Sequence, residues 1–131
     1  SENMTPEFLD PEDVLELHEA SLERWGGSDG IRDQGALEAA IAQPQATFAG
    51  EYLHDDLFSM AAAYAFHISE SQAFLDGNKR TALLAAVVFL DMNGFRLLEP
   101  EDVLYLAMLE IADRKMTKAR LANLLRELAD V

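Results

Sequence analysis

Apolar side chains recur at helical spacing in several separate stretches of the chain, and polar residues, glycines and prolines divide these stretches. The first clear stretch is residues 10–25, where an Asp-Pro pair is typical of a helix start, because the carboxylate caps free backbone N–H groups and proline fits the first turn. We therefore expect an amphipathic surface helix over residues 10–25. Its apolar face consists of four aliphatic side chains among acidic ones: Val14, Leu15, Leu17 and Leu22.

The next stretches are shorter, and glycine and proline interrupt them. Residues 26–30 contain three glycines, which suits a loop with positive φ angles. A short helix is expected over residues 35–43, since Pro44 prevents its continuation. Residues 45–54 have weak strand character on both sides of an Ala-Gly-Glu turn, which predicts a small hairpin or flap.

Two long apolar stretches predict the centre of the fold. Residues 57–68 are apolar on nearly every side of a helix that Asp55 or Asp56 can cap. Residues 82–90 are all apolar, which fits a buried strand or a buried helix. The length of this run and the Asn-Gly cap signal after it favour the helix.

Two further helices are expected at the end of the chain. Glu99-Pro100 opens a segment that predicts a helix over residues 99–112, and Thr117 can cap a last helix that ends near residue 129. The expected fold class is all-α, a bundle of about six helices with two buried central helices and a small flap. We expect a single domain over residues 4–131, and residues 1–3, which precede a Met, are treated as a leftover of cloning.

The composition adds limits on the compartment of the protein. The chain has 131 residues of which half are apolar, which is enough for one core. It contains no Cys, so disulfides and thiolate metal sites are excluded and the reducing cytoplasm is the expected compartment. No apolar run has the length of a membrane span, and no export signal is visible, so we expect no membrane association.

Acidic side chains are concentrated in the first part of the chain. The formal net charge is -14, and residues 1–78 hold 2 basic and 16 acidic side chains, whereas residues 79–131 hold 8 of each. Such a chain repels a phosphate backbone, which disfavours direct binding of nucleic acid and favours a basic protein partner. Acidity that only keeps the protein soluble explains the same numbers. Charge alone does not separate these interpretations.

The junction between the two central stretches reads Asp-Gly-Asn-Lys-Arg-Thr. A loop that enters a helix exposes unpaired N–H groups at the positive end of the helix dipole, which favours an anion. Gly77 permits the close approach of a phosphate, and Asp76 suits a Mg²⁺ shared with phosphate oxygens. Lys79 and Arg80 add positive charge. Local chemistry alone still favours an ordinary helix start, with Asp76 or Asn78 as the cap and both cations solvated.

The sequence Phe-Leu-Asp-Gly-Asn-Lys-Arg-Thr-Ala of residues 74–82 resembles the signature of the Fic/Doc family. In that family a loop of pattern His-x-Phe-x-acidic-Gly/Ala-Asn-Gly/Lys-Arg joins two central helices. The likeness extends upstream to Leu17-His18, Gly26-Gly27, residues 30–33 and residues 37–44, so it covers nearly the whole chain. The order and spacing are specific, and the resemblance therefore favours a phosphate site over an ordinary helix start.

Two positions resemble the Doc branch of the family, because Lys79 stands where typical Fic enzymes have a second Gly and Leu83 where they have a second Arg. Typical Fic enzymes transfer AMP from ATP, whereas the Doc-like pattern implies transfer of the γ-phosphate to a hydroxyl of a protein target. The resemblance implies a translation factor such as elongation factor Tu as target, and therefore a toxin. It also implies a separate Phd-like antitoxin, since the chain has no Ser/Thr-x-x-x-Glu-x-x-x-Asn inhibitory helix.

The resemblance also implies ATP and Mg²⁺ as cofactors and carries roles onto the matching positions. Asp76 would bind Mg²⁺. Gly77 and Asn78 would hold phosphate through the backbone and the side chain. Lys79 and Arg80 would neutralise charge on the transferring group.

Two further family roles fall outside the charged junction. Phe74 would anchor the loop in the core, and residues 45–54 would correspond to the flap that aligns the target peptide. Gln72 stands where the family has its catalytic His, and Ala73 where a Pro often follows. A Gln amide can orient a hydroxyl but cannot accept its proton near neutral pH, so we expect attenuated catalysis.

No histidine of the chain replaces the missing base in the sequence pattern. His67 lies five residues before Gln72, an offset that turns it away from the loop, and its apolar surroundings favour a hydrogen-bonded structural role. His18 and His54 are expected at surface or packing positions.

Three hypotheses follow for function. The first is an attenuated Doc-type transferase that uses ATP, the second is a catalytically inactive module that binds a nucleotide or a partner, and the third is a pure interaction protein. The set of Asp76, Asn78, Lys79 and Arg80 disfavours the third, because a purely structural helix start needs no such set. Gln72 separates the first from the second, and we favour the first.

Overall fold

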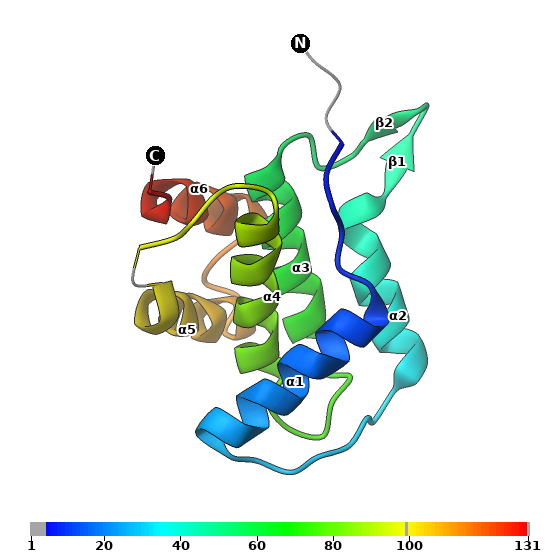
Figure 1. Cartoon of the computed structure of the whole chain (residues 1–131), viewed down its shortest axis with the longest axis vertical. Helices are drawn as coiled ribbons and strands as arrows, with labels where there is room; N and C mark the ends of the chain where they lie inside the picture. Colours follow the sequence, from blue (N-terminus) through cyan, green and yellow to red (C-terminus); the bar gives the residue numbers. More distant parts are fainter. Residues whose placement is uncertain (1–4, 99, 131) are drawn as a thin grey trace.

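The structure is a computed structural model, and it describes residues 5–98 and 100–130. The described part consists of six α-helices, a short 3-10 turn and one two-stranded antiparallel hairpin, which confirms the mostly helical fold that the sequence predicts (Figure 1). The elements are α1 (Pro11–Trp25), α2 (Gln34–Ala42), the 3-10 turn (Gln43–Gln45), β1 (Thr47–Phe48), β2 (Glu51–Tyr52), α3 (Leu57–Ser71), α4 (Asn78–Met92), α5 (Pro100–Ala112) and α6 (Lys118–Leu128).

Side-chain caps place the start of several helices where the sequence predicts them. The Asp10 carboxylate accepts a 2.9 Å hydrogen bond from the N–H of Asp13, and the Asp13 carboxylate accepts one from the N–H of Asp10, which is a complete capping box. Asp56, not Asp55, caps α3 through the N–H of Ser59. Thr117 caps α6 as expected. Glu99, in the expected helix start before α5, lies outside the described residues.

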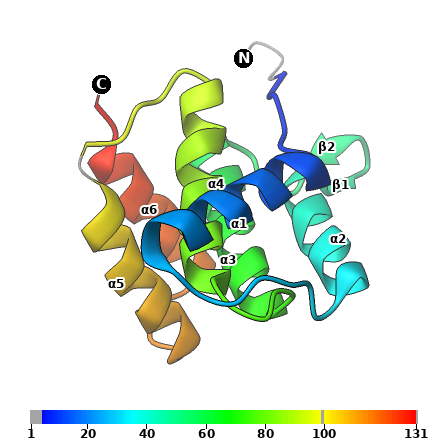
Figure 2. The same ribbon diagram turned by 60° about the horizontal axis from the view of Figure 1, so that its bottom comes forward.

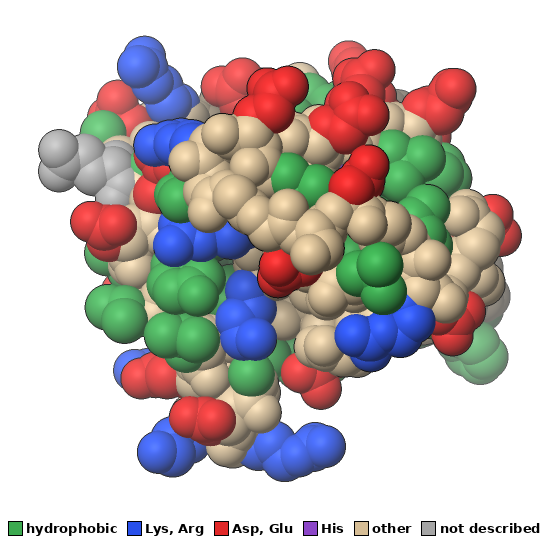
Figure 3. Space-filling view, turned by 90° about the horizontal axis from the view of Figure 1, so that it is seen from below, with side chains coloured by type: hydrophobic (Ala, Val, Ile, Leu, Met, Phe, Trp, Pro, Cys, Tyr) green, Lys and Arg blue, Asp and Glu red, His purple; other side chains and the backbone are tan. Residues whose placement is uncertain are grey.

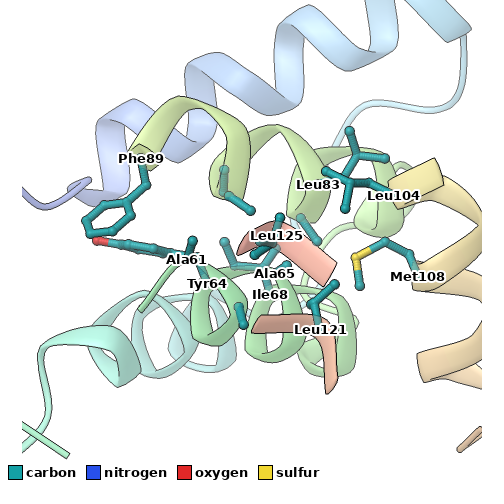
Figure 4. Close-up of a cluster of buried hydrophobic side chains, with 14 of the residues drawn as sticks. Ala61, Tyr64, Ala65, Ile68, Leu83, Phe89, Leu104, Met108, Leu121 and Leu125 are labelled. Carbon is teal, nitrogen blue, oxygen red and sulfur yellow. The ribbon is translucent and has the colours of Figure 1, made fainter. Parts of the chain in front are cut away.

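The two central helices pack against each other through small side chains. α3 and α4 run side by side through the middle, with α1 and α2 on one side and α5 and α6 on the other (Figures 1 and 2). Ala61, Ala65 and Ala85 are buried, and side chains this small let two helix axes approach closely. On the other side, α5 contributes Leu104 and Met108 to the core, and α6 contributes Leu121 and Leu125 (Figure 4). No helix among the described residues is long and apolar enough to span a bilayer.

The core leaves two loop regions at opposite ends of the central helices. The α3–α4 connection, residues 72–77, lies at one end, where α4 begins. The hairpin lies at the other end, because Tyr52 packs against Phe8, and Phe8 stacks on Phe89 in the last part of α4 (Figure 1). With a rise of 1.5 Å per residue, Phe89 lies roughly 16 Å along α4 from its start. The hairpin and the α3–α4 loop are therefore far apart.

Candidate phosphate-binding site

The start of α4 has no side-chain cap. Gly77 is the N-cap residue, with φ of 82°, in the left-handed region that glycine adopts without strain. The alternative in which Asp76 or Asn78 caps this helix is wrong, since no side chain bonds to the first turn. The backbone N–H groups at the start of α4 consequently remain available at the positive end of the helix dipole.

These N–H groups open into a cavity of about 540 Å³. That size is within the range of small-molecule sites. In Figure 3, which shows this end of the molecule, Lys and Arg side chains lie beside hydrophobic ones near the middle of the face. The structure brings six of the sequence-predicted residues to the cavity: Gln72, Asp76, Gly77, Asn78, Lys79 and Arg80. Five lining residues were not among the predicted ones: Trp25, Gly26, Gly27, Leu75 and Tyr105.

Asn78 and Phe74 give the loop its shape. The Asn78 side chain accepts a 3.0 Å hydrogen bond from the N–H of Phe74 and donates one of 3.0 Å to its carbonyl. Phe74 is fully buried. The Asn78 amide is therefore engaged within the loop, and its backbone N–H is the group that faces an incoming anion.

His18 supports the same loop from α1 and is a residue that sequence reasoning left at a surface or packing position. It is 3% exposed, and its Nε2 donates a 2.8 Å hydrogen bond to the carbonyl of Asp76. A Cβ on Gly77 would lie 3.5 Å from this Nε2, so the loop packs in van der Waals contact with the imidazole. In the sequence, only the resemblance of Leu17-His18 to the family indicated that His18 has a role near the loop.

Gly26 and Gly27 line the cavity, and the residues that follow them are hydrogen-bonded to the α3–α4 loop. The carbonyl of Gly30 accepts from the N–H of Leu75, and the carbonyl of Ala73 accepts from the N–H groups of Arg32 and Asp33. A Cβ on Gly30 would lie only 2.7 Å from the Leu75 side chain. Glycine is favoured at position 30 mainly by its φ of 135°, a conformation that other residues rarely adopt.

The expectation that residues 45–54 align a target beside the site is wrong in its location. The hairpin forms as predicted, but it lies at the opposite end of α4 and does not line the cavity. The segment that lies along the loop is residues 30–33, where Ile31 and Phe74 form an isolated antiparallel bridge. The reason is the 15-residue length of α3, which separates the hairpin from residues 72–77.

Ile31 presents an open backbone edge in this arrangement. In its bridge with Phe74 the hydrogen bonds are made by the neighbouring residues, so the N–H and carbonyl of Ile31 point outward. The corresponding groups of Phe74 are taken by Asn78. Within residues 5–98 and 100–130 the structure shows no hydrogen bond to Ile31, whose side chain is 41% exposed.

Asp76 fits a Mg²⁺ that is shared with phosphate. Its Oδ1 accepts from the N–H of Gly77 and its Oδ2 accepts from the N–H of Ser28, which fixes the exposed carboxylate toward the cavity. A Cβ on Gly27 would lie 2.9 Å from Oδ2, so this glycine leaves room for the carboxylate. The described residues contain no group of three His, Asp or Glu that could hold a metal. One carboxylate plus phosphate oxygens and water is a coordination that Mg²⁺ accepts.

Gln72 occupies the head of the loop at the C-cap of α3. Its φ of 51° and ψ of 35° are left-handed, and its side-chain Nε2 donates a 3.0 Å hydrogen bond to the carbonyl of Ser69. The side chain is exposed and lines the cavity. It holds no group that accepts a proton from a hydroxyl near neutral pH.

His67 does not reach the cavity, which agrees with the structural role expected for it. Lys118 donates 3.0 Å hydrogen bonds to the Nε2 atoms of both His67 and His54, so this ammonium group joins α6, α3 and the segment after the hairpin. Burial, followed by the neighbouring Lys118 and His54, lowers the pKa of His67 to about 4. Burial, and next Lys118, also lower the pKa of His54, so the neutral, accepting form of both imidazoles is favoured.

Together these features define a helical protein with an uncapped helix start and two cationic side chains at the loop between its two central helices. The model of the Fic/DOC family matches residues 8–90. The chain is 35% identical over 120 residues to the protein kinase doc of Escherichia phage P1, covering 92% of this chain and 94% of that protein. It is 44% identical over 97 residues to the toxin Doc of Mycolicibacterium smegmatis, covering 74% of this chain and 72% of that protein. The chain belongs to the Fic/Doc family, and within it the chain is Doc-like.

Proposed function

We propose that this chain is a Doc-type toxin that transfers the γ-phosphate of ATP to a hydroxyl of a protein target. The observation that carries the proposal is the uncapped start of α4, which opens into a cavity also lined by Lys79 and Arg80. Free N–H groups, a helix dipole and two cations are the features that bind phosphate. The kinase named among the relatives supports the use of a nucleotide.

Different residues of the loop are proposed to hold Mg²⁺ and the phosphates of ATP. Asp76 would hold Mg²⁺, which supplies charge neutralisation between phosphate oxygens. The backbone of Gly77 and Asn78 approaches the phosphates, and Lys79 and Arg80 face the charge that develops on the transferred group. Phosphoryl transfer depends mainly on such positioning and charge stabilisation.

The target segment is proposed to lie along Ile31. An extended peptide can pair with the outward N–H and carbonyl of this residue, as a strand adds to an open edge. The exposed side chains of Ile31 and Leu75 give this edge an apolar surface beside the cavity. By family resemblance the proposed target is a translation factor such as elongation factor Tu.

Gln72 sets the rate of the proposed reaction. In the transfer, the bond between the γ-phosphorus and the bridging oxygen of ADP breaks, a bond to the target oxygen forms, and the hydroxyl proton must leave. Because the Gln72 amide cannot take that proton, the chemistry is slow. The same observation favours a second candidate function, a module that binds the nucleotide without turnover.

Calorimetry with ATP and Mg²⁺ tests the site. Arg80→Ala should weaken binding at least about tenfold, since a charge-assisted contact contributes ~1.5–3 kcal/mol. Arg120→Ala, an exposed change on α6, is the matched control and should bind as wild type. Incorporation of labelled γ-phosphate into elongation factor Tu or a lysate then separates transfer from binding alone. Equal ATP affinity in wild type and Arg80→Ala would remove this site from consideration.

A Phd-like antitoxin is proposed to dock in a groove between α1, α4 and α5. The toxin named among the relatives supports such pairing. A cavity of about 370 Å³ lies there, and its apolar wall is made of Leu84, Val87, Val88, Leu97 and Pro100. Apolar anchors of an amphipathic helix suit such a groove, and the strongly acidic chain favours a basic segment.

Co-expression with the neighbouring gene product tests the groove. Val87→Glu places a charge on the apolar wall and should abolish capture of the small partner, while ATP binding stays unchanged. Phe48→Glu is the control, because Phe48 is 76% exposed on the hairpin and lies outside the groove. Capture that survives Val87→Glu but fails with Phe48→Glu would move the docking surface to the hairpin.

A further inference from the structure

The guanidinium of Arg80 lies over two aromatic rings from distant parts of the chain. Its Cζ is 4.4 Å from the ring centroid of Trp25, the last residue of α1, and 3.9 Å from that of Tyr105 in α5. All three side chains are half-buried and line the cavity at the start of α4. Neither ring belongs to the loop motif.

The contacts with the rings leave the hydrogen-bonding capacity of Arg80 unused. A guanidinium stacks through its face, whereas its five N–H donors lie in its plane. No ion pair or hydrogen bond involves Arg80 among the residues that the structure describes, although Glu101 and Asp102 line a cavity beside it. Glu101 is instead paired with Arg24 at 2.6 Å. Arg80 is thus held by contact with the rings, and its donors remain available for an anion.

A second arginine contacts the Trp25 ring and links α1 to α5. Arg24 lies over the same ring, 4.6 Å from its centroid, while its guanidinium pairs with Glu101. This pair is exposed, so its own stabilisation is small. Lys79, the other cation of the motif, has no cation–π contact in the described structure.

We propose that Trp25 and Tyr105 are positioning residues that hold Arg80 in its phosphate-binding orientation before the ligand arrives. The inference rests on the proposed function, because it assigns the ligand of Arg80 as the phosphate chain of a nucleotide. A long side chain that is already ordered loses less freedom on binding, which raises affinity without a new contact to the ligand. It also fixes the direction of the N–H donors for the transferred group.

The fluorescence of Trp25 reports directly on its contact with Arg80, since Trp25 is the one tryptophan of the sequence. In the protein without ligand, Arg80→Ala should raise the acrylamide quenching of Trp25 fluorescence, because the ring loses its cover. Inorganic tripolyphosphate, which carries no base or sugar, is the probe for binding by calorimetry. Tyr105→Leu should weaken its binding about 3- to 30-fold, as expected for the loss of one cation–π contact.

Three controls define the test. Tyr105→Phe keeps a ring and should restore wild-type affinity. Leu106→Ala changes an exposed neighbour on α5 and should have no effect on binding or on Trp25. Melting curves by circular dichroism confirm that each variant is folded.

The outcomes separate the inference from the proposed function. If wild type binds tripolyphosphate and Tyr105→Leu binds it equally well, the positioning role is overturned while the phosphate site stands. If wild type binds no tripolyphosphate, the proposed function is overturned and the positioning role with it. Weakening by Tyr105→Leu, with rescue by Tyr105→Phe, supports both.

Discussion

The imidazole of His18 lies parallel to the ring of Phe74, with centroids 3.8 Å apart and an angle of 8° between the planes. The same imidazole donates to the carbonyl of Asp76. One buried side chain of α1 therefore supports both the buried anchor of the loop and the peptide that leads into Gly77. The loop before α4 is therefore supported by a residue that lies 58 positions before Asp76 in the chain.

Replacement of His18 should destabilise the fold and weaken ATP binding together. His18→Ala removes a stacked ring and a buried hydrogen bond, which we expect to cost ~2–4 kcal/mol. Thermal unfolding and calorimetry with ATP and Mg²⁺ measure the two effects. His18→Phe keeps a ring against Phe74 but loses the bond to Asp76, so it should recover part of the stability and little of the affinity. Full affinity in His18→Phe would contradict the role of the hydrogen bond.

Gly27 should be needed for the position of the Asp76 carboxylate, and Gly26 should not. Both residues have positive φ angles, so an alanine at either position costs ~1 kcal/mol in backbone strain. Only at Gly27 would the new Cβ lie 2.9 Å from Oδ2 of Asp76, whereas Gly26 has no atom within 4 Å. We expect Gly27→Ala to reduce the gain in ATP affinity that Mg²⁺ provides.

Titrations of ATP with Mg²⁺ and with a chelator give that gain for each variant. Gly26→Ala should behave as wild type in this comparison despite a similar loss of stability. If the Mg²⁺-dependent gain is the same for both variants, Asp76 does not hold the metal in the way proposed.

The junction of Lys118, His67 and His54 should make stability fall in mild acid. Burial, and next Lys118, lower the pKa of His67 to about 4, below its ordinary value of 6.5. The neutral form is therefore favoured in the folded state, and its stabilisation is fully present above pH 6.5 and is lost as the pH falls toward 4. Because His67 is only half-buried, solvent screening limits this contribution to ~1–2 kcal/mol.

Denaturant unfolding at pH 7 and pH 4.5 measures the difference in free energy of unfolding. In His67→Gln the group cannot titrate, so the decrease between the two pH values should be smaller than in wild type. Lys118→Met removes one cause of the lowered pKa and should also reduce the decrease. A pH dependence that is unchanged in both variants would show that other groups are responsible.

Local signals predicted most of the helices well, because the starts of α1, α3 and α6 are each capped by a side chain next to them. Asp10 and Thr117 cap where the sequence places them, and their bonds reach only three residues along the chain. α3 runs three residues beyond the expected end, to Ser71, because the left-handed conformation that ends it is adopted by Gln72. A glutamine gives no cap signal of the kind that glycine gives.

Contacts between distant segments could not be predicted from the sequence. Trp25, Arg80 and Tyr105 meet only because α1, α4 and α5 converge, and no spacing rule links positions so far apart. The hairpin was predicted, yet its place at the far end of α4 follows from helix length and packing against Phe8. The side chain of Asn78 was assigned to phosphate, since the sequence does not show that it bonds to Phe74.

Gln72→His should raise phosphotransfer by about 10²- to 10⁴-fold, the range that a positioned general base contributes. Position 72 lines the cavity beside Asp76, and the phosphate-handling residues around it are present. On the proposed function, the wild-type chain lacks only the group that removes the hydroxyl proton. The native amide is held by the carbonyl of Ser69, and a histidine at this position offers an imidazole nitrogen that accepts a proton near neutral pH.

The measurement follows labelled γ-phosphate and labelled AMP separately, so that kinase-like transfer and AMP transfer are distinguished. Gln72→Ala is the control for the loss of the bond to Ser69, and it should bind ATP without a gain in transfer. Expression of Gln72→His should also arrest growth, and the co-expressed antitoxin should relieve the arrest. A histidine variant that binds ATP as wild type does, yet transfers neither label, would exclude the transferase hypothesis. The hypothesis of a nucleotide-binding module would then remain, because the general base is the feature that distinguishes the transferase from that module.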